Sequence, residues 1–237
     1  MHASIKRFRT RFKKFQEQSR DPGLTAVLII EGSLIFLVIP LSGMSVIPVM
    51  IVPAMFALLV IAILVVTSRS HVASGVVAIA VLLSPFGAFV HAEHPAVWTE
   101  WLSAGGRLLA IAALSVVIAQ AVFGGGRVTL HRVQGAVVLY LNFGLFFFTL
   151  YRLVDVLALN AYHGLPPSGS DNGSGATLLY FSFATLTTLG YGDIYPLHPM
   201  ARALANFEAV IGQLYPATLL ARLVSLELEH RRQSKSN

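Results

Sequence analysis

The sequence predicts an all-α integral membrane protein with six transmembrane helices. Hydrophobic residues make up 55% of the 237 residues and charged residues only 12%. The mean hydropathy is +0.71, which lies outside the usual balance of a soluble globular domain. A membrane span needs about 20 predominantly apolar residues, and a helix satisfies its own backbone polar groups in lipid. Six segments meet this requirement: residues 24–41, 46–67, 72–90, 103–123, 133–157 and 203–225.

The distribution of basic residues predicts the orientation of these spans. Seven of the 17 Lys and Arg residues lie between Lys6 and Arg20, and the loop at residues 91–102 has none. A cytoplasmic N-terminus places the other basic loops in the cytoplasm too, as the positive-inside rule requires. We therefore expect both termini in the cytoplasm and the protein in a plasma membrane, the inner membrane in a bacterium. Because the net charge of +6 is concentrated in this way, it does not indicate nucleic acid as a partner.

Residues 1–22 form a basic N-terminal segment. Ile5, Phe8, Phe12 and Phe15 recur at helical spacing among its Lys and Arg residues. This pattern is typical of an amphipathic helix that lies on a membrane surface, where anionic lipids attract its charges. A calmodulin-type target helix or a disordered arm would show the same composition. The sequence leaves these alternatives open.

The loop between the fifth and sixth predicted spans carries the most specific motif of the chain, at residues 185–193. A cation that leaves water must exchange its hydration shell for a ring of oxygens, and backbone carbonyls from four copies of one loop provide such a ring. Gly190 and Gly192 permit the left-handed backbone that turns successive carbonyls toward one axis. In order, the residues are Thr185, Leu186, Thr187, Thr188, Leu189, Gly190, Tyr191, Gly192 and Asp193.

These nine residues resemble the potassium-channel signature T-x-x-T-x-G-Y-G-D and match every fixed position, with Leu189 where valine or isoleucine is commoner. The resemblance implies a re-entrant pore helix, a selectivity-filter loop and a homotetramer, because one chain supplies one of four filter strands. It also implies passive, potassium-selective conduction with K⁺ as the permeant ligand and no cofactor. The K⁺ ligands would be the carbonyls of Thr188, Leu189, Gly190 and Tyr191 and the Thr188 hydroxyl, with Gly192 completing the filter.

The resemblance assigns a pore helix and supporting residues to the segment before and after the filter. A helix over residues 176–187 would be about 18 Å long, and five extended residues would return about 16 Å, so the segment enters and leaves by one face of the membrane. Ser174 is a candidate N-cap for this helix. Tyr180 and Phe181 stand where relatives often have two tryptophans. The residues expected to support the filter are Thr185, Thr187, Asp193, Tyr180 and Phe181.

The sixth predicted span contains two features that weaken a helix. Pro216 lacks the N–H that would bond the Gly212 carbonyl. Related channels bend their inner helix at a glycine or at a proline motif, so residues 212–216 are a candidate gating hinge, with a static kink as the alternative. Glu208 lies one turn before Gly212 and is a possible tuning acid, which either bonds the pore helix or adds negative field to the ion path.

The first four spans resemble, in number and layout, the peripheral domain of six-span channels. A voltage sensor needs three or four charges per subunit, whereas the fourth span has only Arg107, so we expect no steep voltage gating. Glu31, in the first span, is expected to be a protonated or hydrogen-bonded packing acid rather than a partner of Arg107. The predicted domains are the N-terminus at 1–22, a peripheral domain at 23–123, a Gly-rich cytoplasmic linker at 124–132, a pore domain at 133–228 and a basic cytoplasmic tail at 229–237.

Other functions remain open at this point. A potassium transporter would carry four degenerate helix-loop-helix repeats, and this chain has one. A non-selective cation channel, or a silent subunit that modulates another pore, is the alternative that Leu189 keeps open. The sequence contains no phosphate loop and no nucleophile beside a base, so it does not predict an enzyme.

Overall fold

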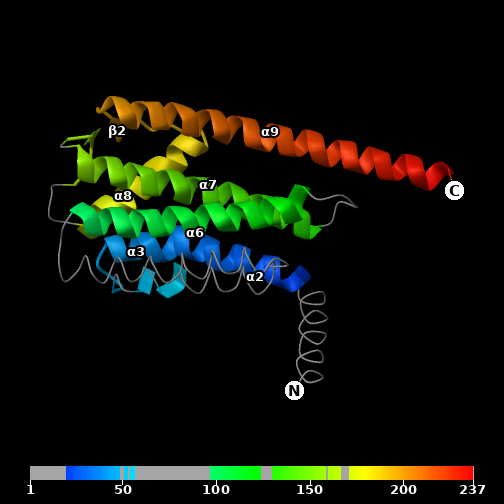
Figure 1. Ribbon diagram of the computed structural model, residues 1–237, viewed down its shortest axis with the longest axis horizontal. Helices are drawn as coiled ribbons and strands as arrows, with labels where there is room; N and C mark the ends of the chain where they lie inside the picture. The colour runs from blue at the N-terminus through cyan, green and yellow to red at the C-terminus, as the bar shows by residue number, and fades with distance from the viewer. Residues whose placement is uncertain are drawn as a thin grey trace, which may run out of the picture.

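The structure is a computed structural model that describes residues 20–48, 51–52, 54–56, 97–123, 130–158, 160–166 and 171–236. Over these residues the chain forms long helices that pack along one another, with one small sheet near one end (Figure 1). The predicted all-α architecture is therefore found with a single two-stranded exception. The elements in chain order are α2 (Arg20–Ser33), the π-helix η1 (Leu34–Val38), α3 (Ile39–Gly43), α6 (Val97–Phe123), α7 (Leu130–Leu157), β1 (Tyr162–His163), α8 (Asp171–Leu186), β2 (Tyr195–Pro196) and α9 (Pro199–Ser236).

Three helical stretches of the described residues are long and apolar enough to cross a membrane. They are Thr25–Gly43, Trp101–Gln120 and Arg132–Leu157. These stretches overlap the first, fourth and fifth predicted spans. The third predicted span and most of the second lie outside the described residues, as does the N-terminal segment up to residue 19, so the count of six spans and the amphipathic helix stay predictions.

Helix α9 has 38 residues, which is long enough to cross a membrane, yet it is not among these three apolar stretches. Its predicted span, residues 203–225, contains the polar residues Asn206, Glu208 and Gln213. Polar residues inside a spanning segment usually face other protein groups or a water-filled path rather than lipid. The sixth span therefore stays a prediction, with a polar content that would suit a helix packed against protein or a water-filled path rather than lipid alone.

The structure moves two predicted helix starts and describes the form of the predicted C-terminal tail. Helix α6 begins at Val97, six residues before the predicted start of the fourth span, so it includes half of the loop predicted at residues 91–102. Helix α8 begins at Asp171, which places Ser174 inside the helix and not at its N-cap. Helix α9 continues to Ser236, so the segment assigned to a tail is mostly helical. No Gly or Pro follows Pro216 in α9, and its last turns are rich in strong helix formers.

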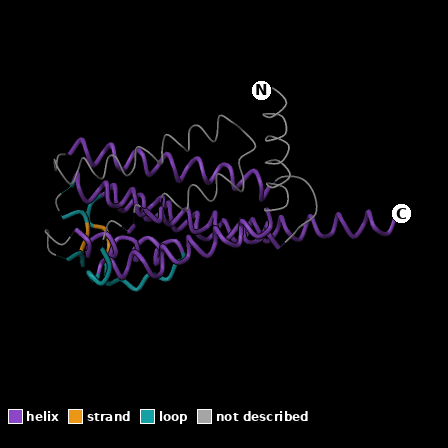
Figure 2. Tube along the Cα trace, turned by 90° about the horizontal axis from the view of Figure 1, so that it is seen from below, coloured by secondary structure: helices purple, strands orange, loops and turns teal. Residues whose placement is uncertain are grey.

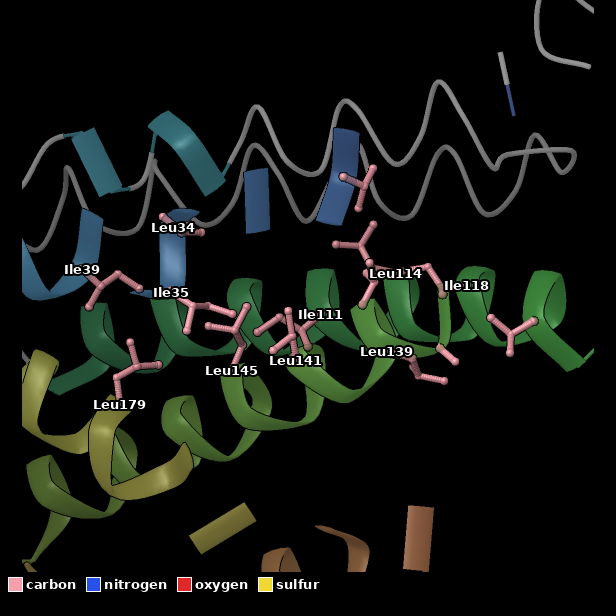
Figure 3. Close-up of a cluster of buried hydrophobic side chains, with 14 residues drawn as sticks. Leu34, Ile35, Ile39, Ile111, Leu114, Ile118, Leu139, Leu141, Leu145 and Leu179 are labelled. Carbon is pink, nitrogen blue, oxygen red and sulfur yellow. The ribbon is translucent and has the colours of Figure 1, made fainter. Parts of the chain in front are cut away.

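The larger apolar core lies where the first span, α6 and α7 meet (Figure 3). Between transmembrane helices, such contacts stabilise the association through close packing rather than through expulsion of water. The cluster places α7 at the centre of the fold, in contact with α2, α6, α8 and α9. The buried side chains that Figure 3 labels are Leu34, Ile35, Ile39, Ile111, Leu114, Ile118, Leu139, Leu141, Leu145 and Leu179.

A second, aromatic cluster lies at the end of the bundle that carries the sheet (Figure 2). Phe147 and Tyr151 of α7 pack there with Tyr162 of β1, Phe181 of α8 and Ile194, which follows the motif. The ring centroids of Tyr151 and Phe181 are 4.9 Å apart. This cluster fixes the segment after the motif against α7. At the other end, α9 extends past the other described helices (Figure 2).

Candidate ion-conduction site

Helix α8 is the short helix that the resemblance predicted in front of the filter. Its 16 residues span about 24 Å, which is less than the roughly 30 Å hydrocarbon core, and its apolar part is Ser174–Leu186. It packs against α3, α7 and α9. The Phe183 ring fits against Gly144 of α7 so closely that an added Cβ at Gly144 would lie 2.5 Å from the ring. Helix α8 is thus a short helix held among longer ones.

The backbone after α8 alternates in hand. Thr188, Gly190 and Gly192 have φ values of 57°, 59° and 81°, whereas Leu189 and Tyr191 are not among the described residues with positive φ. A backbone whose φ alternates in sign in this way can turn successive peptide carbonyls toward one axis, as a cation pathway needs. The sequence predicted this conformation for the two glycines. It did not predict it for Thr188, where a left-handed backbone costs about 1–2 kcal/mol and marks a strained, functional position.

Hydrogen bonds from the end of α8 hold this segment. The Ala184 carbonyl accepts the N–H of Leu189 at 2.8 Å and the N–H of Gly190 at 3.2 Å. The hydroxyls of Thr185 and Thr187 donate to carbonyls one turn earlier in α8, at 2.8 and 2.6 Å. These two threonines therefore use their hydroxyls within α8. The backbone N–H groups after α8 bond to its last turn instead, Thr188 to the Thr185 carbonyl at 2.9 Å and Leu189 and Gly190 to the Ala184 carbonyl, which sequence reasoning did not identify.

Of the two aromatic residues that stand where relatives often have tryptophan, Tyr180 contacts the motif residues Tyr191 and Asp193. Its hydroxyl donates to the Asp193 carboxylate, with distances of 3.0 and 3.2 Å to the two oxygens. Its ring stacks on Tyr191 at 6.2 Å with an interplanar angle of 13°. Phe181 instead points into the aromatic cluster with Tyr151. Tyr180 of α8 thus contacts both Tyr191 and Asp193, near the end of the motif.

A short strand pair holds the segment beyond Asp193. Strands β1 and β2 pair antiparallel, with Tyr162 opposite Pro196 and His163 opposite Tyr195. Gly164 has a φ of 83°, and a Cβ there would lie 2.3 Å from the Asp193 carbonyl oxygen, so only glycine fits. Sequence analysis missed this pairing because two-residue strands carry no periodic signal.

The backbone of α9 touches the end of α8 at Gly212. A Cβ at Gly212 would lie 1.8 Å from the Leu186 carbonyl oxygen, and the same oxygen accepts a hydrogen bond from Tyr140 of α7 at 3.1 Å. Gly212 is therefore a close contact as well as the predicted hinge residue. Pro216 is exposed and lies inside a continuous α9. The hinge itself stays a prediction.

One residue before Pro216, α9 is anchored to α7. The Tyr215 hydroxyl donates to the Ala136 carbonyl at 2.8 Å. The Tyr215 ring stacks on Tyr140 at 5.8 Å and meets Phe143 edge-on at 5.4 Å. Any movement of α9 at residues 212–216 must therefore disturb this anchor.

The two buried acids differ in their surroundings. Glu208 is fully buried and contacts Tyr151 of α7 and Ser182 of α8. Glu31 is also fully buried, and neither carboxylate oxygen has a hydrogen-bond partner among the described residues. The hydrogen-bonded role expected for Glu31 is thus not found in this part of the chain. Arg107 donates to Ser103 on its own helix.

Residues 187–193 and one side of α9 are exposed in the single chain. Leu189 is 56% and Tyr191 is 68% exposed. Apolar side chains of this size rarely lie open in quantity without a partner or lipid to cover them. The exposed large apolar side chains of α9 include Met200, Phe207, Val210, Leu214, Leu220 and Val224.

A short helix packed among longer ones, followed by a segment in which φ alternates in sign, is the arrangement expected of a pore-forming membrane protein. Residues 135–228, from α7 into α9, match the family model described as "Ion channel". This match supports a pore domain of the potassium-channel type and an ion-channel function. The comparisons with curated proteins and with solved structures gave no match.

Proposed function

We propose that the chain is one subunit of a homotetrameric, potassium-selective channel that conducts passively. The observation that carries the proposal is the alternating backbone at Thr188, Gly190 and Gly192, because aligned carbonyls are what replaces the water of a dehydrated cation. The permeant K⁺ would bind the carbonyls of residues 188–191, with the Thr188 hydroxyl as a further ligand.

The tetramer is supported by what one chain lacks. A single chain supplies one filter segment, and four are needed to surround an ion on all sides. Leu189 and Tyr191 are exposed in the isolated subunit, as is the apolar side of α9. Four copies around one axis would cover these surfaces with one another. Lipid contact of the basic N-terminal segment is part of the same proposal, on sequence evidence alone.

Weak voltage dependence is supported by the composition of α6. It carries the single basic residue Arg107, which donates to Ser103 one turn away. Moving one charge through the whole field yields about 2.3 kcal/mol per 100 mV, which is far less than an array of three or four charges per subunit. The open probability is therefore expected to change little with voltage.

The test is a bi-ionic reversal potential. Purified protein is reconstituted in a planar bilayer with K⁺ on one side and Na⁺ on the other, and current is recorded over a series of voltages. A reversal close to the potassium equilibrium potential is expected. A reversal near zero would mean a non-selective cation pore, and absence of current from folded tetramers would mean a silent subunit.

Paired glycine variants link the current to the filter. In Gly190→Ala the new Cβ meets nothing within 4 Å, but φ is +59°, so the loss should come from backbone strain alone. In Gly175→Ala, on α8, the Cβ also meets nothing and φ is not positive. We expect the first variant to lose potassium current as an intact tetramer and the second to keep it. Tyr191→Ala is expected to conduct with weaker selectivity.

A further inference from the structure

Glu208 of α9 lies at the centre of a buried polar cluster that joins α9 to α7 and α8. Its Oε2 accepts the Tyr151 hydroxyl of α7 at 2.5 Å, and its Oε1 lies 2.6 Å from Ser182 Oγ of α8. Ser182 Oγ also lies 2.8 Å from the carbonyl oxygen of Gly144 on α7. The side chains of Tyr151, Ser182 and Glu208 are all 0% exposed.

These three oxygen–oxygen contacts need three protons. The Tyr151 hydroxyl supplies one and the Ser182 hydroxyl supplies one, while the Gly144 carbonyl has none to give. With Glu208 ionised, only two protons are present for the three short contacts. One pair of oxygens then lies at hydrogen-bond distance with no proton between them. With Glu208 protonated, every contact has its proton.

Only one arrangement of the protons fills all three contacts. Tyr151 donates to Oε2, the carboxylic acid donates from Oε1 to Ser182 Oγ, and Ser182 donates to the Gly144 carbonyl. A proton on Oε2 would leave the Tyr151 hydroxyl proton without an acceptor among its described partners. The geometry therefore favours a neutral Glu208, and it favours Oε1 as the oxygen that carries the proton.

The surroundings favour the same charge state. The described partners of Glu208 are two hydroxyls, so no described basic side chain neutralises a carboxylate there. The other titratable groups that sense its charge are Tyr140 of α7 and Tyr162 of β1, and both are phenols that carry no charge at neutral pH. A buried, unpaired carboxylate is costly and tends to be protonated instead.

We propose that Glu208 is a positioning residue that acts as a neutral carboxylic acid, tying α8 to α7 and α9 and so setting the filter. This inference rests on the proposed function for its effect on conduction. Ser182 lies two residues before Ala184, whose carbonyl holds Leu189 and Gly190. A shift of α8 at Ser182 is therefore passed directly to the filter backbone.

Loss of the proton reverses this arrangement. An ionised Glu208 attracts the Ser182 proton, because hydrogen bonds to a charged acceptor are about twice as strong as neutral ones. The Gly144 carbonyl then faces a serine oxygen without a proton between them, and the link between α8 and α7 is lost. Conduction should therefore fall as the pH rises through the titration of Glu208.

The protonation state is tested first without reference to conduction. Infrared difference spectra of the purified wild-type protein and Glu208→Gln, at neutral pH, isolate the carbonyl band of a neutral carboxylic acid at this position. We expect the band in the wild type and its loss in the variant. A difference spectrum with carboxylate bands alone overturns the inference, whether or not the protein conducts potassium.

The positioning role is tested by flux of K⁺ from liposomes at neutral and alkaline pH. In Glu208→Gln the amide N–H replaces the acid proton and the amide oxygen still accepts from Tyr151, so flux should match the wild type at neutral pH. We expect wild-type flux to fall about tenfold at alkaline pH, since loss of one such link changes an equilibrium by roughly that factor, and Glu208→Gln to stay flat.

Ser182→Ala serves as the matched disruption, because it removes both of the serine's contacts and leaves Glu208 in place. Its flux should be low at every pH, while its tetramer remains intact by size-exclusion chromatography. Folded Glu208→Gln tetramers without flux would mean that the negative charge is needed, which overturns the inference. Equal pH dependence in the wild type and Glu208→Gln would also overturn it. Absence of potassium flux in the wild type would instead contradict the proposed function, and the infrared result would still stand.

Discussion

The contact between Gly212 and the end of α8 makes the sharpest prediction about α9. A methyl group at Gly212 would lie 1.8 Å from the Leu186 carbonyl oxygen and 2.7 Å from its carbon. Both are backbone atoms, so no change of rotamer relieves the clash. Gly212→Ala must therefore push α9 and α8 apart.

The size of this displacement follows from the contact distance. Because Cβ contacts below 3.0 Å essentially do not occur, the two backbones must separate by about 1.2 Å or more in a close-packed interior. Overpacking of this kind costs about 1–3 kcal/mol in each subunit. The end of α8 also carries the carbonyl that holds the filter, so we expect at least a tenfold loss of potassium flux and a lower melting temperature.

Two further variants separate packing from flexibility. Gly105→Ala, on α6, adds a Cβ with nothing within 4 Å and should be neutral or slightly stabilising, as Ala is in a helix. Gly212→Ala combined with Gln213→Gly restores a flexible residue at the next, exposed position without removing the clash. Flux and melting temperature are measured for all three in liposomes and in detergent.

We expect the double variant to stay inactive, because the clash at position 212 remains. Recovery of flux in the double variant would show that flexibility, and not close contact, is what Gly212 supplies. A Gly212→Ala protein with wild-type flux and melting temperature would refute the contact argument altogether.

Three other substitutions have specific outcomes. Tyr180→Phe removes the hydroxyl that bonds Asp193 at 3.0 Å but keeps the ring, so it should lose about 1 kcal/mol and show faster decay of current or weaker selectivity; unchanged current would remove the bond from the filter's support. Tyr215→Phe loses the 2.8 Å hydrogen bond that ties α9 to α7. If this bond stabilises a closed state, the open probability in single-channel records should rise about fivefold. A lowered open probability would mean that the bond stabilises the open state. Gly144→Ala should destabilise the protein through its clash with Phe183, and Phe183→Leu in the same chain should restore part of the melting temperature; simple additivity of the two losses would contradict this.

The parts of the site that the sequence predicted are those whose requirements are local. A left-handed backbone needs glycine, so Gly190 and Gly192 indicate their own conformation. A long apolar stretch indicates a span wherever it occurs, as the stretches at Thr25–Gly43 and Arg132–Leu157 do. The short pore helix was also predicted, although its start lay several residues too late.

The parts that could not be predicted depend on residues far apart in the chain. Gly212 is constrained by Leu186, and Gly164 by Asp193; nothing near either glycine in the sequence specifies its partner. Thr188 adopts a left-handed backbone that its own side chain disfavours, because the hydrogen bonds around it dictate the conformation. Tertiary contacts, rather than local propensity, decided these positions.

The length of α9 gives the protein a lever. Its 38 residues make a rod of about 57 Å, and roughly 30 Å of it lies beyond Pro216. With the near end fixed at Gly212 and Tyr215, a bend of about 10° at this fulcrum would sweep the far end through about 5 Å. A weak force on the C-terminal end of α9, from lipid or from a bound partner, would thus exert a larger torque at Gly212 and Tyr215 than the same force on a shorter helix.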